Sequence, residues 1–357
     1  MAKSAEKETR RVAEGIDKVV PPRVRTAITA GLPPAVTDLI KSAVRSWPMR
    51  SLNKILERGA DRRYAQGKRM TTAAEIRAAF DRLALPDGAV VFMHSSMSRL
   101  GYVEGGASTV VNALRGAVVE KRHGTVAVPT FSMSGGMAET LRAGEIFDVR
   151  NTPSGTGRIT ELIRKQPDAR RSLHPTHSVA AIGPRASWLV EAHHRDPRSF
   201  GPSSPFGRLL EADGYVLGLG IDLGPVTFYH VVEDLGAFPI DVYTSDSPIT
   251  VSCLDYHGTR IEMGVMAHDP AASVTRIDKP NGVAIRTYMT AVLESAAGLT
   301  WHVIGDGRMW LVNARRFCQS LVQLKECGIT IYASADAVAS LPPPGSVLRQ
   351  VLSNRER

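Results

Sequence analysis

The chain has 357 residues, of which 43% are hydrophobic and 22% charged. This composition allows one large or two smaller globular domains, and it excludes a fibrous or wholly disordered protein. No apolar run approaches the roughly 20 residues of a membrane span, and the N-terminus lacks the pattern of a secretion signal. We therefore expect a cytoplasmic protein without a transmembrane segment. Its three cysteines have no metal-type spacing and are interpreted as reduced thiols.

The excess positive charge lies at the N-terminus. Residues 1–70 contain 16 Lys and Arg against 7 Asp and Glu, which accounts for the whole net charge of +9. Because the remainder is neutral, no nucleic-acid partner is expected. Prolines interrupt helical pieces at 36–44 and 52–63. We interpret residues 1–70 as a basic helical arm that packs on its own protein, with docking on a second subunit or an acidic surface as the alternative.

From residue 72 onward, helices and strands alternate. Thr72 to Glu75 form a capping box that opens a helix to Leu85, and a Pro-Asp-Gly turn leads into a strand at 89–93. The same alternation continues with strands at 125–130, 179–183 and 215–220 and helices at 108–118, 152–164, 186–193, 205–211 and 226–235. This pattern predicts an α/β fold with a mostly parallel central sheet flanked by helices.

After Pro239 the pattern changes. Short strands are expected at 241–243, 249–256 and 259–263, with a hairpin turn at Tyr256-His257-Gly258. They predict an antiparallel insertion over residues 241–280. The chain then continues with a helix at 285–297, strands at 301–304 and 309–312, and a helix at 314–327. The predicted globular domain spans 71–335, and residues 336–357 form a C-terminal tail.

The segment Arg171-Ser172-Leu173-His174-Pro175-Thr176-His177-Ser178 is the first candidate for chemistry. It is a polar turn at the entrance of a buried strand, where side chains of α/β proteins converge on ligands. Pro175 keeps the backbone of His174 out of the α region and so fixes the direction of its imidazole. Such a histidine suits a general base. The alternative is that His174 and His177 only cap backbone groups of a tight turn.

Three other segments are candidates. The loop 94–106 leads from a strand end into a helix N-terminus, a geometry that favours an anion such as phosphate, although it carries no known phosphate-loop pattern. His230 and Glu233 lie on one helical face. Together with His174 they could form a base with its orienting carboxylate or a metal site, but the HExxH spacing is missing and no metal is predicted. The turn 201–206 either walls a pocket or is a plain loop.

In their order along the chain, these segments resemble the aminoglycoside 3-N-acetyltransferase family. The resemblance covers about residues 72 to 330 and rests on an ordered set of motifs rather than on one of them. The motifs are His94-Ser95-Ser96-Met97-Ser98 with Gly105-Gly106, Gly124-Thr125 to Pro129-Thr130-Phe131, Phe147-Asp148, Thr152-Pro153-Ser154-Gly155-Thr156-Gly157, Arg171 to Ser178, Ser204-Pro205-Phe206, and His230 to Glu233.

The resemblance implies an α/β acyltransferase fold, distinct from the GNAT enzymes, that transfers acetyl from acetyl-CoA to an amine. His174 would be the general base, and Glu233 would orient that base or bind the ammonium group. His177 could exchange roles with His174. The residues implied for acetyl-CoA are Ser95, Ser96, Met97, Gly105, Gly106 and Thr130, and those implied for the acceptor are Asp148, His177, Ser178 and His230.

The expected acceptor is an aminoglycoside or a related amino sugar. Between Phe131 and Phe147 the only acidic residues are Glu139 and Glu145, whereas a polycation calls for a strongly acidic surface. A biosynthetic N-acetyltransferase acting on another amine is therefore kept as an alternative. A metal-dependent hydrolase using the three candidate ligands and a non-catalytic scaffold recruited through the basic arm are further alternatives. A homodimer is left open.

Overall fold

The computed structural model describes residues 69–344, apart from 134–135, 245–246 and 275. The predicted basic arm, with its helical pieces at 36–44 and 52–63, lies outside the described residues except for Arg69 and Met70. Residues 345–357 of the predicted tail also lie outside them. Over the ranges that are described, no helix is both long enough and apolar enough to cross a membrane.

The described elements keep the predicted alternation and add short strands and helices that were not predicted. The strands are β1 (Met70–Thr71), β2 (Val90–Ser95), β3 (Tyr102–Val103), β4 (Thr125–Pro129), β5 (Phe147–Asp148), β6 (Arg170–Arg171), β7 (Val179–Ile182), β8 (Tyr215–Leu219), β9 (Ile249–Leu254), β10 (Arg260–Val265), β11 (Thr300–Ile304) and β12 (Gly307–Asn313). The α-helices are α5 (Ala73–Asp81), α6 (Ala107–Leu114), α7 (Met137–Arg142), α8 (Arg158–Arg164), α9 (Ala186–Val190), α10 (Pro205–Glu211), α11 (Val231–Asp234), α12 (Val283–Ala296), α13 (Ala314–Glu326) and α14 (Ala335–Ala339). Short 3₁₀ turns are η1 (Met97–Arg99), η3 (His193–Arg195), η4 (Thr227–His230) and η5 (Pro280–Gly282), and a π-helical turn, η2 (Arg115–Glu120), continues α6.

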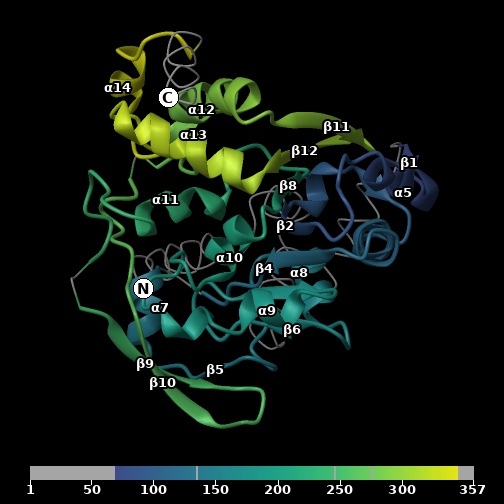
Figure 1. Ribbon diagram of the computed structural model, residues 1–357, viewed down its shortest axis with the longest axis horizontal. Coiled ribbons are helices and arrows are strands. Elements are labelled where there is room, and N and C mark those ends of the chain that lie inside the picture. Colours follow the sequence, from purple (N-terminus) through teal and green to yellow (C-terminus); the bar gives the residue numbers. More distant parts are fainter. Residues whose placement is uncertain (1–68, 134–135, 245–246, 275, 345–357) are drawn as a thin grey trace, which may run out of the picture. The chain divides into compact units, whose positions relative to one another are not determined.

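A seven-stranded sheet in the order β11-β12-β8-β2-β4-β7-β6 forms the centre of the fold (Figure 1). The α/β class is confirmed, but the prediction of a mostly parallel sheet is wrong. Strand β2 pairs in parallel with β4 and with β8, whereas the four outer pairings of this sheet are antiparallel. A hairpin joins β11 to β12, a turn joins β6 to the antiparallel β7, and β7 in turn pairs antiparallel with β4. The helix–strand alternation of the sequence does not reveal the direction of these strands.

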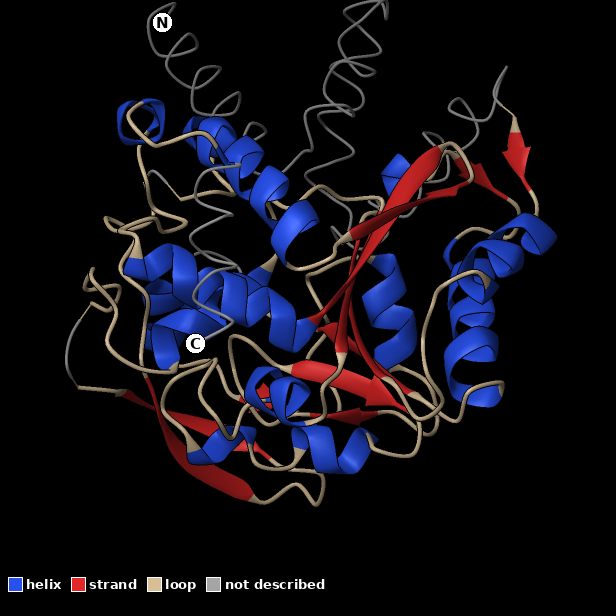
Figure 2. Cartoon of the chain, turned by 45° about the horizontal axis from the view of Figure 1, so that its top comes forward, coloured by secondary structure: helices blue, strands red, loops and turns tan. Residues whose placement is uncertain are grey.

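Both faces of this sheet are covered by helices (Figure 2). Alternate residues of β2 point to opposite faces: Val90 and Phe92 join one apolar core, and Val91 and Met93 join the other. The first core also takes side chains from α9, α10, α12 and α13, and the second from α5, α6 and α8. The continuous apolar sequence of β2 follows from this burial on two sides.

A smaller sheet in the order β10-β9-β5 lies beside α7, away from α12 and α13 (Figure 1). The predicted antiparallel insertion is confirmed in the β9–β10 pair, with Ile249 opposite Val265. Strand β5 then pairs in parallel with β9. The strand predicted at 241–243 is reduced to one antiparallel bridge between Tyr243 and His268. That bridge joins the segment before β9 to the segment after β10.

The capping box at the start of α5 is confirmed. The Thr72 hydroxyl accepts the backbone N–H of Glu75 at 3.2 Å, and the Glu75 carboxylate accepts the backbone N–H of Thr72 at 2.8 Å. Replacing Thr72 with alanine leaves one of the first N–H groups of the helix without its acceptor. We expect Thr72→Ala to lower the free energy of unfolding by about 1 kcal/mol, measured by urea denaturation.

The matched control is Ser295→Ala, which removes an exposed hydroxyl bonded to the carbonyl of Ala291 inside α12. This change should alter stability by less than about 0.5 kcal/mol. Equal losses in the two variants would show that the cap contributes nothing specific.

Candidate active site

Loops from four strands meet at one edge of the central sheet. Strands β2, β4 and β8 run in parallel, so their carboxyl ends lie at the same edge. Strand β7 runs antiparallel to β4, with Val179 opposite Pro129, so the turn that precedes β7 lies at this edge as well. The topology therefore brings together the predicted segments 94–106, 171–178 and 230–233, at the edge where α/β proteins bind ligands.

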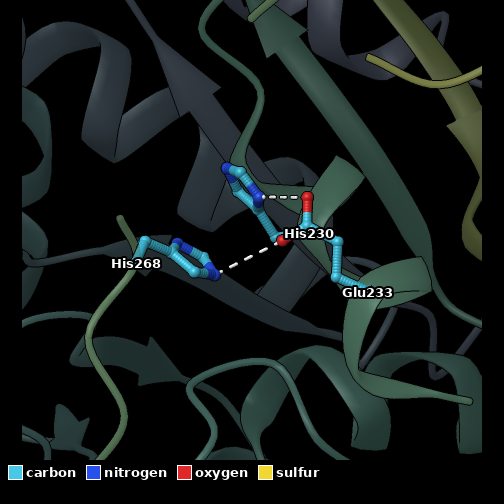
Figure 3. Close-up of side chains that lie close together, drawn as sticks. All are labelled: His230, Glu233 and His268. Atoms are coloured by element: carbon cyan, nitrogen blue, oxygen red, sulfur yellow. Dashed lines mark hydrogen bonds and ion pairs between the residues drawn. The ribbon is translucent and has the colours of Figure 1, made fainter. Parts of the chain in front are cut away.

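His230 and Glu233 are in direct contact, as their spacing predicts. The 3₁₀ turn η4 passes into α11 at His230, so the two side chains lie one turn apart on the same face. The Nδ1 atom of His230 lies 2.8 Å from Oε1 of Glu233 (Figure 3). The hydroxyl of Tyr332 donates to the same oxygen at 2.8 Å. The Glu233 side chain is fully buried, whereas 9% of the His230 side chain remains exposed.

A second imidazole reaches Glu233 from the other side. Nε2 of His268 lies 3.3 Å from Oε2 of Glu233 (Figure 3). His268 follows β10 in the insertion 241–280, and its backbone N–H contacts the Met137 sulfur at 3.5 Å. The carboxylate of Glu233 is thus shared between two histidines that come from different parts of the chain.

The surroundings of this carboxylate set its charge and that of His230. Burial acts to raise the pKa of Glu233, but the charges and contacts of His230 and His268 outweigh it, so that this pKa is lowered. Burial lowers the pKa of His230, and Glu233 opposes this only in part. At neutral pH we therefore assign an ionised Glu233 that accepts Nδ1–H from a neutral His230. Nε2 of His230 is then a free base, and it has no hydrogen-bond partner among the described residues.

Phe200 forms an aromatic wall beside these groups. Its ring centroid lies 5.0 Å from that of His230 and 4.9 Å from that of His177, and it stacks on His268 at 5.9 Å. The turn 201–206 supports this wall, because Ser204 caps α10 and Phe206 packs on Phe200 at 4.8 Å. Burial against this ring contributes to the desolvation that lowers the pKa of His230 and of His177.

His174 is fully buried, and its ring takes part in the structure of its own turn. Nδ1 of His174 accepts the backbone N–H of His177 at 3.0 Å, and Nε2 lies 3.4 Å from the hydroxyl of Ser199. The ring stacks on His193 at 4.3 Å. His193 is in turn held between the Ser172 hydroxyl and the Ser199 carbonyl, at 2.8 and 2.9 Å. No contact between His174 and Glu233 occurs among the described residues.

His177 lies between the two groups of histidines. Its ring centroid is 6.1 Å from that of His174 and 6.4 Å from that of His268. Phe131 meets its edge at 4.7 Å, and Nδ1 lies 3.1 Å from the Thr176 hydroxyl. Burial, followed by the nearby His268 and His230, lowers the pKa of His177 well below its usual value. This histidine, rather than His174, belongs to the neighbourhood of His230 and His268.

Thr130 and Ser178 surround a buried arginine. The Arg171 guanidinium donates from Nε to the hydroxyls of Thr130 and Ser178, both at 3.1 Å, and from Nη2 to the Thr130 carbonyl at 2.6 Å. Nη1 donates to the carbonyl of Thr152 at 2.5 Å, and the guanidinium stacks on the Phe147 ring at 4.7 Å. Burial, and then Arg164, lower the pKa of Arg171 to about 9, which leaves it charged at neutral pH. This network joins the end of β4 to the start of β7.

The loop expected to hold the coenzyme follows β2. Ser95 ends the strand, Ser96 precedes η1, and the two hydroxyls of Ser96 and Ser98 lie 3.3 Å apart. Gly105 and Gly106 both have positive φ, and Gly106 caps α6 with φ 64° and ψ −140°, a conformation open to glycine. Four backbone N–H groups at the start of α6 lack partners within the helix and can bind an anion.

Asp148 lies at the end of β5 and is engaged in its own turn. Its carboxylate accepts the backbone N–H groups of Arg150 and Asn151 at 2.8 and 3.0 Å, and the Asn151 side-chain amide at 2.7 Å. These bonds outweigh partial burial, and the pKa of Asp148 is lowered. The carboxylate is anionic, but most of its acceptor capacity is already used locally.

Sequence reasoning missed His268, Tyr332 and His193. His268 and Tyr332 lie 35 and 99 positions from Glu233, respectively. No sequence spacing links them to it. His193 was predicted at the end of a helix, which in the structure ends at Val190. The unusual density of histidines in this chain segment, with His193 and His194 shortly after His174 and His177, was the one available signal.

Comparison with known proteins identifies the relatives of this chain. The family profile described as aminoglycoside 3-N-acetyltransferase matches residues 92–325. Aminoglycoside N(3)-acetyltransferase III of Serratia marcescens is 35% identical over 182 residues, which cover 48% of this chain and 66% of that protein. Aminoglycoside N(3)-acetyltransferase VIII of Streptomyces fradiae is 35% identical over 185 residues, covering 48% and 64%. These alignments span about two thirds or less of each relative.

Solved structures extend the likeness over most of the fold. The aminoglycoside acetyltransferase AAC(3)-Xa has a TM-score of 0.60 and 27% identity, covering 76% of this chain and 98% of that chain. AAC-IIIb, solved as a binary complex with CoASH, has the same fold with a TM-score of 0.60, 24% identity and coverage of 72% and 98%. The family profile covers more than half of the residues. The resemblance of the sequence motifs is thereby confirmed, and the chain belongs to the aminoglycoside 3-N-acetyltransferase family.

Proposed function

We propose that this protein is an acetyl-CoA-dependent N-acetyltransferase whose acceptor is an amino group of an aminoglycoside or a related amino sugar. Family membership supports the reaction class and the cosubstrate. The observation that carries the proposal is the buried pair of His230 and Glu233, joined at 2.8 Å, with the second ring nitrogen of His230 free. A neutral imidazole held by a carboxylate is the arrangement of an oriented general base.

The proposed reaction is a direct attack without an acyl-enzyme. The acceptor amine gives a proton to Nε2 of His230 as its nitrogen attacks the thioester carbonyl. The carbon–sulfur bond then breaks, and the departing thiolate takes the proton from His230 as CoA leaves. Glu233 stabilises the imidazolium that exists between these two transfers, and it keeps Nδ1 protonated throughout.

We assign the role of general base to His230 and not to His174. Both nitrogens of His174 are engaged inside the protein and its side chain is fully buried, so a substrate amine has no free lone pair to approach there. We therefore assign His174 a positioning role, because it accepts the N–H of His177 and fixes that turn. His177 would contact the acceptor beside His230, and Glu233 keeps the orienting role expected from the sequence.

The coenzyme is proposed to bind along the loop 94–106. His94 is buried at the end of β2, and its Nε2 lies 3.5 Å from the Thr227 hydroxyl in η4, the turn that carries His230. The loop and the proposed base are thus adjacent. Ser95, Ser96, Met97 and the two glycines would hold the phosphate and pantetheine portions, whereas Thr130 acts through the Arg171 network. Asp148 and Ser178 are proposed to contact the acceptor.

The test is release of CoA thiol from acetyl-CoA across a panel of aminoglycosides and simple amino sugars. Turnover with an aminoglycoside supports the proposed function. Turnover with an amino sugar alone would identify a biosynthetic enzyme, which is the alternative that the sparse acidic residues between Phe131 and Phe147 favour. No thiol release with any amine, together with no acetyl-CoA binding, would overturn the proposal.

Gly106→Ala is expected to raise the KM for acetyl-CoA by about 10-fold or more, with a smaller change in kcat. A side chain at φ 64° and ψ −140° strains the backbone by about 1–3 kcal/mol, and relief of that strain shifts the N–H groups that start α6. Steady-state kinetics with varied acetyl-CoA measures the effect.

Gly144→Ala is the matched control, since Gly144 also has positive φ, at 72°, and is exposed after α7. It should lower stability without changing the KM for acetyl-CoA. If Gly106→Ala also left this KM unchanged, the coenzyme would not use the start of α6.

A further inference from the structure

Two buried polar atoms beside the proposed base have no hydrogen-bond partner. Oε2 of Glu233 and Nε2 of His268 are both buried, and neither forms a hydrogen bond within the described part of the protein. They lie 3.3 Å apart, so the pair is in contact but is not aligned as donor and acceptor. Buried polar atoms are normally satisfied, and an unsatisfied pair that faces each other indicates a missing third partner.

The chemistry of these atoms selects the class of that partner. One donor atom each from His230, Glu233 and His268 lie within 4.8 Å of one another (Figure 3). Two imidazoles and one carboxylate form a zinc-type ligand set that leaves the fourth tetrahedral position to water. Metal–ligand distances of about 2.0–2.1 Å place neighbouring ligand atoms about 3.3–3.4 Å apart in a tetrahedron. The separation of Glu233 and His268 already has this value.

Charge and access are also compatible with a dication. Glu233 supplies an anion, and Asp234 is the next residue in α11. Arg276, a positive charge that acts on His230, is paired with Asp278 through contacts of 2.5 and 3.0 Å. The side chains of His230 and His268 remain 9% and 10% exposed, so both rings reach the surface although Oε2 of Glu233 and Nε2 of His268 are buried.

We propose that His230, Glu233 and His268 form a binding site for a divalent cation of the zinc class, and that occupancy of this site switches off acetyl transfer. A bound cation would be coordinated by the carboxylate that orients His230, so that this orienting contact is lost. It would also add a positive charge beside the attacking amine. Metal binding itself is independent of the proposed function, whereas the inhibition rests on it. The sequence suggested His174, His230 and Glu233 as possible metal ligands, whereas in this site His268 takes the place of His174.

The binding test uses the full-length protein freed of metal with a chelator. Zn²⁺ binding is measured by competition with a chromophoric chelator, and Co²⁺ binding by the visible absorption of the tetrahedral ion. The test variant is His268→Gln, whose amide can still donate to Glu233 but is a poor metal ligand. The matched control is His257→Ala, which removes an exposed histidine from the turn between β9 and β10.

We expect one high-affinity cation per chain in the wild type and in His257→Ala, and an affinity at least about 10-fold lower in His268→Gln. The proposed site would be overturned if the wild type and His268→Gln bound the cation with equal affinity, or if the wild type bound no cation. Circular dichroism of each variant verifies that a lost affinity does not reflect unfolding.

The inhibition test follows the acetylated product by mass spectrometry, because Zn²⁺ also binds the thiol of CoA. Each variant is compared with itself in the presence and absence of Zn²⁺. Wild-type turnover should fall with Zn²⁺ and return on adding chelator, and His268→Gln should need at least about 10-fold more Zn²⁺ for the same fractional loss. Metal binding without inhibition would overturn the switch. Binding in a protein that acetylates no amine would instead count against the proposed function.

Discussion

Replacing His230 with asparagine is expected to lower kcat/KM for acetyl transfer by about 10²–10⁴-fold, the range that a positioned general base contributes. The Nδ2 group of asparagine lies near the position of Nδ1 and can still donate to Glu233, which the wild-type ring contacts at 2.8 Å. The change therefore removes Nε2 while it keeps the buried carboxylate paired. Steady-state kinetics with saturating acetyl-CoA measures the effect.

The same substitution at His174 is the matched comparison. The Oδ1 atom of asparagine can accept the backbone N–H of His177, as Nδ1 of His174 does at 3.0 Å. We expect His174→Asn to retain activity within about 10-fold of the wild type, because a positioning role survives when its hydrogen bond is restored. A loss of about 10²–10⁴-fold in His174→Asn, with His230→Asn close to wild type, would return the role of the base to His174.

The pH dependence of kcat gives a second readout of the same assignment. Burial lowers the pKa of His230, against the opposing effect of Glu233, so the neutral form that accepts a proton predominates at neutral pH. The rate of the wild-type enzyme should rise as pH increases through this lowered pKa and then level off. His230→Asn should lose this acid limb. An unchanged acid limb in the variant would exclude His230 as the group that titrates.

Arg171→Met is expected to lower the free energy of unfolding by about 2–3 kcal/mol, because buried acceptors of the guanidinium lose their donor. Methionine fills a similar volume, but it leaves the carbonyl of Thr152 without the guanidinium donor that lies 2.5 Å away, whereas the carbonyl of Thr130 keeps the Ser178 hydroxyl as a donor at 2.8 Å. Each buried acceptor that loses its donor costs about 1–3 kcal/mol. Chemical denaturation followed by circular dichroism measures the loss.

Arg77→Ala is the control for loss of a positive charge, since Arg77 is exposed on α5. It should change stability by less than about 0.5 kcal/mol. Arg171→Lys should be more stable than Arg171→Met. The ammonium keeps the positive charge, but it cannot donate to all four acceptors of the planar guanidinium at once. A stability of Arg171→Met equal to that of Arg77→Ala would show that the buried network contributes nothing.

Several parts of this protein follow from short stretches of sequence. The capping box at Thr72 and the helix 205–211 lie at their predicted positions because their signals are contained within a few residues. The contact between His230 and Glu233 follows from a spacing of three on a helical turn, although the predicted helix is divided into η4 and α11. The ordered motifs were sufficient to indicate the family.

The rest was decided by tertiary structure. The direction of the outer strands depends on which distant segments pair, so helix–strand alternation predicted the parallel centre of the sheet and missed its antiparallel flanks. His268 and Tyr332 reach Glu233 only because the insertion and the segment after α13 fold back onto α11. Burial then decides which histidine has a free nitrogen for the proposed reaction. His174 carries the stronger sequence signal, but the folded chain uses both of its nitrogens, and it is His230 that keeps a free one beside an ionised carboxylate.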